Sequence, residues 1–232
     1  MADKLDTKKV RIWDVPVRLF HWTLVILLIT SYFSGRAGGD WMKLHFWSGY
    51  TILTLLLFRI AWGFVGSTTA RFSHFVKGPA AWVVYLRDLL TGRRTYDVGH
   101  NPVGGIMVLV LIFAVLAQAM AGLFSADTDL GTVNGPLANA IADKWVDRLT
   151  AFHKFWVNVI WCLVALHVLA AITYLVWKRQ NLIGSMFTGR KPLDHVAEAG
   201  KPAPTLTFAS GRLAISLLIA AAAIVYFCIR LG

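Results

Sequence analysis

Apolar residues are gathered into five blocks along the chain, and polar connections separate the blocks. Each block is close to the roughly 20 residues that an α-helix needs to cross the hydrocarbon core of a bilayer. The pattern therefore predicts an all-α membrane protein whose chain crosses the lipid bilayer five times. The five predicted transmembrane helices are residues 17–34, 44–65, 103–124, 152–177 and 213–231.

The polar residues suggest how these helices are grouped. The first four helices carry every histidine that falls inside a span, and we expect them to form one four-helix transmembrane domain, residues 1–190. Residues 191–211 are basic, with Gly, Pro and Ala, and are predicted to be a cytoplasmic linker. The segment 212–232 has no histidine, acid or amide between its two arginines, which predicts an appended C-terminal transmembrane helix. Residues 78–90, which start with Gly-Pro, predict an interfacial helix on the cytoplasmic surface.

The composition agrees with a membrane protein. The chain of 232 residues is 57% hydrophobic and only 15% charged, whereas a soluble domain has about 25% charged residues. Its net charge of +11 would on its own suggest nucleic acid as a partner. However, sixteen basic residues lie in the N-terminal tail and the second and fourth connections, and six lie on the alternate side. By the positive-inside rule the N-terminus is cytoplasmic, the C-terminus is outside, and nucleic acid is excluded as a partner.

The two cysteines give no sign of a covalently attached cofactor. Cys162 and Cys228 both lie inside predicted spans, and the sequence has no Cys-x-x-Cys-His motif. Covalent attachment of a c-type haem is therefore excluded. We expect both cysteines to pack as small apolar residues.

The candidate chemistry is carried by histidines inside the spans. His153 and His167 lie fourteen residues apart in the fourth helix. This spacing turns them to within about 40° of the same face and separates them by roughly 21 Å along the axis. His21 lies near the cytoplasmic end of the first helix, and His45 lies near the outer end of the second. Polar groups in hydrocarbon are costly, so these four are functional candidates, the alternative being histidines that only form hydrogen bonds inside a bundle.

Depth in the membrane pairs these histidines across the helices. His45 and His153 fall at the outer level, and His21 and His167 fall nearer the cytoplasm. Zinc sites use three or four ligands, often thiolates or carboxylates, and a proton relay would include acids within the spans, whereas these spans contain none. Two facing imidazoles suit the axial ligation of haem iron. We therefore predict two stacked haems b, one held by each pair.

Three further polar residues are candidates for specific contacts. Arg59 lies fourteen residues after His45 and could bind a haem propionate, since arginine pairs with carboxylates through two hydrogen bonds. Equally, its side chain could extend to the cytoplasmic interface. His100, in the segment GHNPVGG, could donate a hydrogen bond or a proton to a quinone, the alternative being a residue that only precedes the third helix. Gln118 is expected to form a hydrogen bond between helices.

Several segments of the chain resemble one protein family, in the same order and over nearly the whole length. They are RIWDVPVRLFHW, LHFWSGYTILTLLLFRIAWGFVGS, ARFSHFVKGP, YLRDLL, GHNPVGG, the FH…LH helix and MFTGRKP. On these segments the chain is similar to the bacterial cytochrome b561 family, which includes the cytochrome b subunit of nickel–iron hydrogenases. The resemblance implies a four-helix bundle in the bacterial inner membrane, electron exchange with the quinone pool, and two haems b ligated by the residues matching His21, His45, His153 and His167.

The residues and the resemblance leave several functions open. The first is an electron carrier between quinone and a periplasmic redox protein such as a c-type cytochrome. The appended fifth helix resembles the branch of the family that is associated with periplasmic c-type cytochromes. Acids of the third connection would then form a docking surface. The others are a hydrogenase-type cytochrome b subunit and a superoxide oxidase with quinone as acceptor, the latter disfavoured by the balanced charge of the outer loops. A metal transporter is disfavoured because the spans lack carboxylates. The acids of the third connection are Asp127, Asp129, Asp143 and Asp147.

Overall fold

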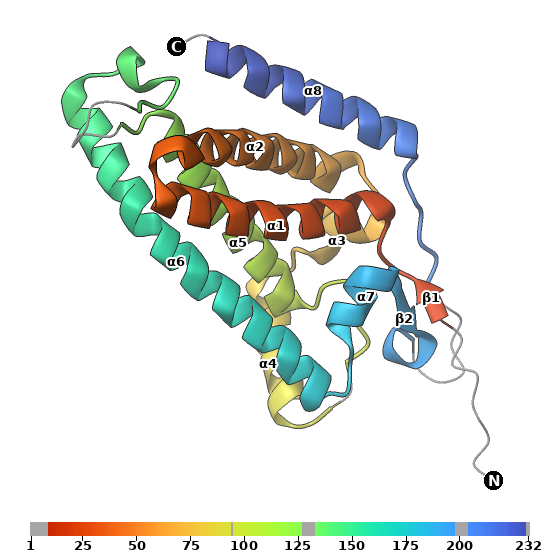
Figure 1. The fold of residues 1–232 in the computed structure, drawn as a ribbon. Coiled ribbons are helices and arrows are strands. Elements are labelled where there is room, and N and C mark those ends of the chain that lie inside the picture. Colours follow the sequence, from red (N-terminus) through yellow and green to blue (C-terminus); the bar gives the residue numbers. More distant parts are fainter. Residues whose placement is uncertain (1–8, 94, 127–132, 198–203, 231–232) are drawn as a thin grey trace.

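The computed structural model describes residues 9–93, 95–126, 133–197 and 204–230, and it is mostly helical (Figure 1). A small two-stranded sheet is formed by β1 (Lys9–Arg11) and β2 (Arg190–Pro192). The helices are α1 (Val15–Ala37), α2 (Met42–Val65), α3 (Phe72–Phe75), α4 (Pro79–Leu90), α5 (Pro102–Leu123), α6 (Asp143–Val176), α7 (Leu182–Thr188) and α8 (Gly211–Arg230).

Five of these helices, α1, α2, α5, α6 and α8, are long and apolar enough to cross a membrane, which confirms the five predicted spans. The start of α6 is the point at which the prediction was wrong, because the helix begins at Asp143 and not at residue 152. Its first turns are amphipathic: Val146 and Thr150 are buried on one side, whereas Asp147 is exposed. An uninterrupted apolar run was the wrong criterion for the start of a helix whose first turns have only one buried side.

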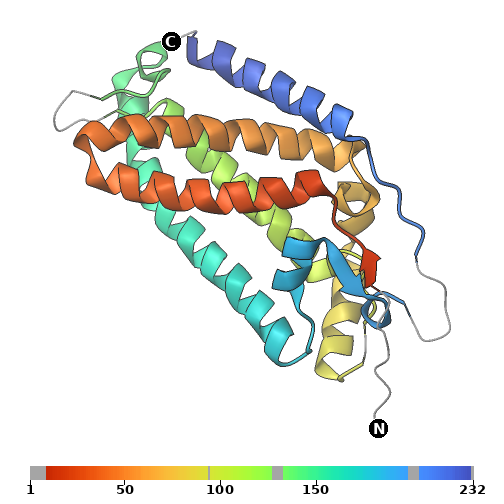
Figure 2. The same cartoon turned by 45° about the vertical axis from the view of Figure 1, so that its right-hand side comes forward.

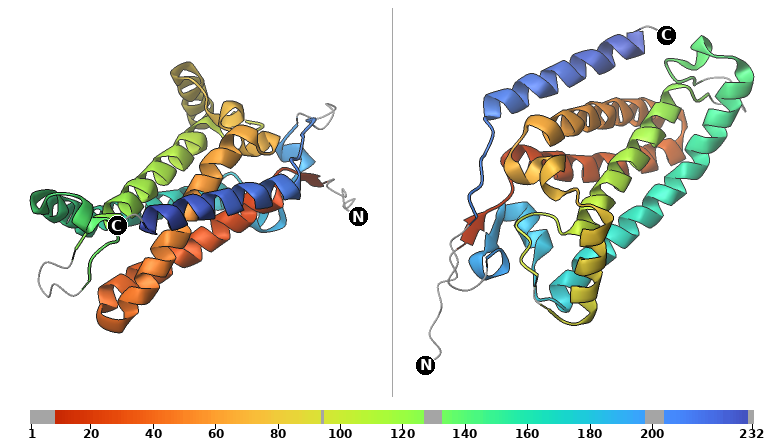
Figure 3. Two further views of the ribbon diagram at one scale, coloured as in Figure 1. Left: turned by 90° about the horizontal axis from the view of Figure 1, so that it is seen from above. Right: turned by 180° about the vertical axis from the view of Figure 1, so that it is seen from behind.

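The long helices are arranged as two pairs. α1 packs along α2, α5 packs along α6, and contacts between α2 and α5 join the two pairs. α1 and α6 do not pack extensively on each other, and they diverge in both ribbon views (Figures 1 and 2). α8 lies along α2 (Figure 3). As a result α2 is the central helix, with 50% of its most apolar stretch buried, compared with 6% for α6.

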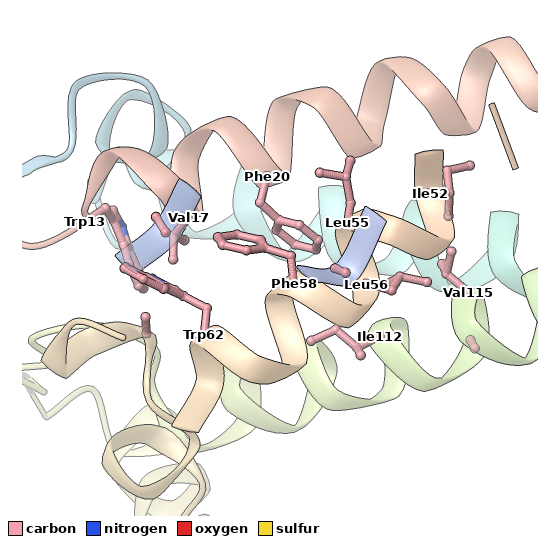
Figure 4. Close-up of a cluster of buried hydrophobic side chains, with 14 of the residues drawn as sticks. Trp13, Val17, Phe20, Ile52, Leu55, Leu56, Phe58, Trp62, Ile112 and Val115 are labelled. Carbon is pink, nitrogen blue, oxygen red and sulfur yellow. The ribbon is translucent and has the colours of Figure 1, made fainter. Parts of the chain in front are cut away.

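Side chains of α2 form the centre of the hydrophobic core (Figure 4). Leu56 and Trp62 are completely buried, and Phe58 stacks on Trp62 with the ring centroids 5.7 Å apart. Phe20 from α1 and Ile112 from α5 complete the same cluster. Between membrane helices such packing stabilises through van der Waals contact more than through release from water.

A small cap closes one end of the helices. β1 and β2 pair in antiparallel register, with Val10 opposite Lys191. β1 precedes the four spans α1, α2, α5 and α6, and β2 follows them. An even number of crossings therefore returns the chain to the side on which it began, as this pairing requires. We call residues 9–13 and 182–196, which include both strands and α7, the end cap.

A left-handed glycine fixes the end cap to the start of α1. Gly189 ends α7 with φ +77°, a conformation that glycine adopts at low cost. Its carbonyl accepts hydrogen bonds from the backbone N–H groups of Ile12 and Trp13, at 2.8 and 3.1 Å. A Cβ at position 189 would lie 2.9 Å from the carbonyl oxygen of Trp13. The close approach of the two segments therefore requires glycine.

Asp14 connects the start of α1 to the end of α2. One carboxylate oxygen caps α1 by accepting the backbone N–H of Val17 at 2.8 Å, and the other accepts the indole N–H of Trp62 at 2.9 Å. The side chain is 2% exposed. The prediction of the first helix from its apolar run missed the role of this aspartate. An aspartate two residues before a proline at a helix start is a recognisable capping signal.

The chain leading to α8 is held in place on the surface of the second connection. The backbone N–H of Thr68 donates to the carbonyl of Thr207 at 3.0 Å, and that of Ala209 donates to Ser67 Oγ at 3.1 Å. The guanidinium of Arg11 lies 4.3 Å from the ring centroid of Phe208. α8 then buries its small side chains against α2, so it is packed on the other helices along its length.

The segment predicted to be an interfacial helix is helical over the expected residues, as α4. Several of its large apolar side chains are exposed, including Val83, Val84 and Leu90, while Tyr85 is buried toward the other helices. The placement of α4 on the membrane surface stays a prediction.

Candidate functional site

The four span histidines meet in two pairs, one toward each end of α6. The rings of His45 on α2 and His153 on α6 have centroids 6.0 Å apart and lie nearly perpendicular, at 88°. The rings of His21 on α1 and His167 on α6 have centroids 6.4 Å apart, at 52°. These are the same two pairs that depth in the membrane predicts, and we call them the outer pair and the inner pair.

A backbone carbonyl fixes the orientation of His45. Nδ1 of His45 donates to the carbonyl oxygen of Ser31 at 2.8 Å, across from α2 to α1, and the Ser31 hydroxyl lies 3.2 Å from the same nitrogen. A carbonyl can only accept a hydrogen bond, so the proton lies on Nδ1. The lone pair of Nε2 is therefore free to bind a metal.

His153 is oriented in the same way by α5. Its Nδ1 donates to the carbonyl oxygen of Gln118 at 2.9 Å, and the side-chain amide of Gln118 donates to the carbonyl of His153 at 3.0 Å. The expectation that Gln118 forms a hydrogen bond between helices is confirmed. Its backbone carbonyl also selects the tautomer of His153, which the sequence analysis missed.

Glycines make room for both rings of the outer pair. A Cβ on Gly35 would lie 2.7 Å from Nδ1 of His45, and a Cβ on Gly122 would lie 2.9 Å from Cε1 of His153. Any larger residue would push an imidazole away from the carbonyl that orients it. A Cβ on Gly49, one turn after His45, would have no other atom within 4 Å, so this glycine borders open space.

That open space is a cavity of about 750 Å³ beside the outer pair, between the two helix pairs. Its wall includes Gly49, His45 and His153, and the aromatic rings of Tyr32 on α1 and Trp161 on α6, which meet edge to face at 5.2 Å. Most of the lining is apolar, and the volume is typical of sites for cofactors and other small molecules.

The outer pair fits a haem group. A metal ion bound by one nitrogen of each of two imidazoles, at about 2 Å each, needs ring centres roughly 6 Å apart. Haem iron takes two such axial ligands, and a mostly apolar cavity with neutral imidazoles suits its flat ring. Among the described residues, no group of three or more His, Cys, Asp or Glu side chains forms a metal site. Axial ligation by these histidines stays a prediction.

The inner pair is built against the end cap. The ring of His21 lies edge-on to Trp22, at 4.9 Å, and Trp22 stacks on Phe187 of α7 at 4.0 Å. Arg18 donates to the backbone carbonyls of Met186 and Phe187 at the end of α7. Nδ1 of His21 is buried and has no hydrogen-bond partner among the described residues.

Arg59 lies inside the protein on α2. Its side chain is 2% exposed, with Cζ 5.3 Å from the ring centroid of Phe72. Within the described part of the chain, its Nη1 is buried and has no hydrogen-bond partner. The alternative in which Arg59 extends to the interface is therefore wrong. A buried guanidinium with an unused donor suits a carboxylate ligand.

His100 lies between two aromatic rings at the same end. Its ring centroid is 4.7 Å from both Trp13 and Phe75, and Nδ1 is buried without a partner among the described residues. Burial, reinforced by the nearby Arg59 and Lys191 cations, lowers the pKa of His100 to about 3. The imidazole is therefore neutral at physiological pH. It can offer a hydrogen bond but holds no extra proton to donate.

Lys191 holds the segment that carries His100. This residue is the first of the predicted cytoplasmic linker, and its side chain is buried, at 4% exposed. Its ammonium group donates to the backbone carbonyls of Asp97 and Gly99, at 3.2 and 3.3 Å. Burial lowers the pKa of Lys191 to about 8, with the Asp97 carboxylate acting in the opposite direction. A lysine in a Gly/Pro-rich stretch gives no sequence signal of burial.

Only two of the four acids of the predicted docking surface are among the described residues. Asp127 and Asp129 lie outside the described residues. Asp143 and Asp147 are exposed in the first turns of α6, next to the exposed Lys144.

One protein family and several bacterial proteins are similar to this chain over most of its length. The family model described as prokaryotic cytochrome b561 matches residues 12–189. A probable Ni/Fe-hydrogenase B-type cytochrome subunit of Rhizobium leguminosarum bv. viciae is 24% identical, over 81% of this chain and 90% of its own length. Proteins of the same description from Bradyrhizobium diazoefficiens and Cupriavidus necator are 22% and 24% identical, over 78% and 82% of this chain and 85% and 89% of their own lengths. No solved structure gives a significant match.

Proposed function

The chain belongs to the prokaryotic cytochrome b561 family, and from this premise we propose that it is a di-haem membrane cytochrome linking quinone to a periplasmic redox partner. As a member of the family it is a multi-pass bacterial membrane protein and a b-type cytochrome of electron transfer. The observation that carries the finer proposal is the meeting of the four span histidines in two pairs, with ring centroids 6.0 and 6.4 Å apart.

A different pair of histidines binds each of the two proposed haems. His45 and His153 ligate the outer haem, with their tautomers set by the carbonyls of Ser31 and Gln118. His21 and His167 ligate the inner haem. Haem b, when bound, supplies a one-electron redox centre at each level. The fixed imidazole orientation limits reorganisation around each centre when its charge changes.

The inner level is the proposed quinone end. The positive-inside charge distribution supports a position of this level at the cytoplasmic side of the inner membrane, with the C-terminus on the periplasmic side. Arg59 there binds a haem propionate, and the unpartnered Nδ1 of His100 supports a hydrogen bond to a quinone oxygen. The neutral imidazole of His100 can orient that oxygen while a proton comes from elsewhere.

A specific observation favours a second candidate. The curated relatives named above are probable Ni/Fe-hydrogenase B-type cytochrome subunits and are matched over most of their length. In that case the outer haem would accept electrons from a hydrogenase, and a periplasmic c-type cytochrome would not be the partner. A superoxide oxidase is the remaining alternative, and it would use the same outer cavity.

The haem content of the purified protein tests the proposal. We expect two non-covalent haems b per chain by pyridine haemochrome, both reduced by an added quinol. Quinol-reduced protein should then be mixed with an oxidised c-type cytochrome, to see whether the cytochrome reoxidises the outer haem. Oxidised protein should be mixed separately with hydrogenase reduced by H2 and with superoxide, to see which of them reduces the outer haem. One haem or none in folded protein would overturn the di-haem proposal, and failure of quinol to reduce either haem would overturn the quinone role.

Arg59→Leu tests the inner propionate contact. We expect the inner haem to be lost more easily and its reduction potential to fall, because the cation that favours the reduced state is gone. A redox titration followed optically measures both effects, and the outer haem should be unaffected. Arg87→Leu, an exposed arginine of α4, is the matched control. Unchanged retention and potential in Arg59→Leu would rule out the contact.

A further inference from the structure

The cavity beside the outer pair has an uneven distribution of charge. Two cationic side chains, Arg36 and Lys154, are part of its lining, and no acidic residue is among the described residues that line it. Neither cation has a carboxylate partner within 4.0 Å in the described part of the chain. The outer loops as a whole carry balanced charge, but the described lining of the cavity is therefore positively charged.

The two cations come from helices on opposite sides of the cavity. Arg36 lies in the last turn of α1, directly after Gly35, which packs against the ring of His45. Lys154 follows His153 on α6. α1 and α6 both border this cavity and do not pack extensively on each other. Arg36 is thus adjacent in sequence to the glycine that contacts the ring of His45, and Lys154 is adjacent in sequence to His153.

Arg36 is also partly pre-positioned. Its Cζ lies 5.3 Å from the ring centroid of Tyr32, one turn earlier on α1 and itself part of the cavity wall. This cation–π contact keeps the guanidinium near the cavity without using its hydrogen-bond donors. A guanidinium held in this way remains able to bind a carboxylate through two hydrogen bonds.

We propose that Arg36 and Lys154 bind the two carboxylates of the outer haem, one from each wall of the cavity. The proposal rests on the proposed function, in which this cavity holds a haem b. Haem b has two carboxylates, and the described residues that line the cavity include two cations and no acid, so charge and number agree. The pairing would connect α1 to α6 through the bound group, beside the contact between the rings of Tyr32 and Trp161.

The test measures haem retention and not only activity. Arg36→Gln and Lys154→Gln should each speed transfer of the outer haem to apomyoglobin by roughly two- to fivefold, the range expected for ion pairs that are exposed to water. The midpoint potential of the outer haem should fall, and that of the inner haem should not change. Lys43→Gln and Lys144→Gln, exposed cations that do not line the cavity, are the matched controls.

Haem dimethyl ester separates the contact from a general loss of stability. Haem-free protein should be reconstituted with haem or with the diester, which has no carboxylates. We expect the wild type to lose the diester as fast as the variants do, because the interaction is already absent. If the variants retain haem as well as the wild type, or lose the diester faster than the wild type does, the proposal is wrong. A purified protein with no outer haem would instead overturn the proposed function.

Discussion

Replacing His153 by alanine should reduce the haem content of the purified protein from two per chain to one. The outer haem would lose an axial ligand, while the inner pair, at the other end of α6, keeps both of its imidazoles. Pyridine haemochrome measures the content, and the reduced optical spectrum should lose only one component. His45→Ala should give the same result, and His167→Ala should remove the other component. His195→Ala, in the end cap, is the histidine control and should retain both haems.

The result depends on each pair acting independently. If His153→Ala lost both haems while the chain stayed folded, the assignment of one haem to each pair would be wrong. Folding is therefore measured separately, by circular dichroism and by elution as a single species in detergent. A variant that keeps its helices and exactly one spectral component would support the pairing.

Asp14→Ala should cause a large loss of stability. It removes the cap of α1, worth about 1 kcal/mol. It also leaves the buried indole N–H of Trp62 without an acceptor, at a cost of about 1–3 kcal/mol. The buried Arg59 would in addition lose a nearby negative charge. We expect a decrease of about 2–4 kcal/mol in the free energy of unfolding, measured by thermal or denaturant unfolding in detergent.

Two other variants sharpen the interpretation of Asp14. Asp14→Asn retains one acceptor oxygen, so it should preserve either the cap or the contact with Trp62 and show an intermediate loss. Asp40→Ala removes an exposed aspartate at the opposite end of α1, and it should change stability by less than about 0.5 kcal/mol. Equal stability of Asp14→Ala and the wild type would show that these buried hydrogen bonds contribute little.

The sequence was sufficient to predict the spans and the pairing of histidines. Lipid imposes an apolar run of fixed length, so the five helices could be read directly. The fourteen-residue spacing of His153 and His167 returns to one helix face, and the alternating direction of successive spans then gives the depth of His21 and His45. Both arguments depend on local geometry and on the order of the helices, which a single sequence contains.

Contacts between distant segments could not be predicted in this way. β1 and β2 are three residues long, too short to show an alternating pattern, and their pairing joins residues on either side of four spans. The burial of Lys191 depends on that same closure, and the hydrogen bond from Trp62 to Asp14 depends on the packing of α1 along α2. The selection of the Nδ1 tautomer of His153 by a backbone carbonyl of α5 leaves no trace in residue types, because every residue has such a carbonyl.

The pairing of β1 with β2 also has a consequence for how the protein is made. The ribosome synthesises β1 before β2, and β2 emerges only after α1, α2, α5, α6 and α7 have been translated. At about 5–20 residues per second, the N-terminal strand waits many seconds for its neighbour. During that interval Trp22 lacks the ring of Phe187, and the side of the inner pair that the end cap covers is open to the solvent. A strand that is translated before the four spans is thus among the last segments to reach its final position.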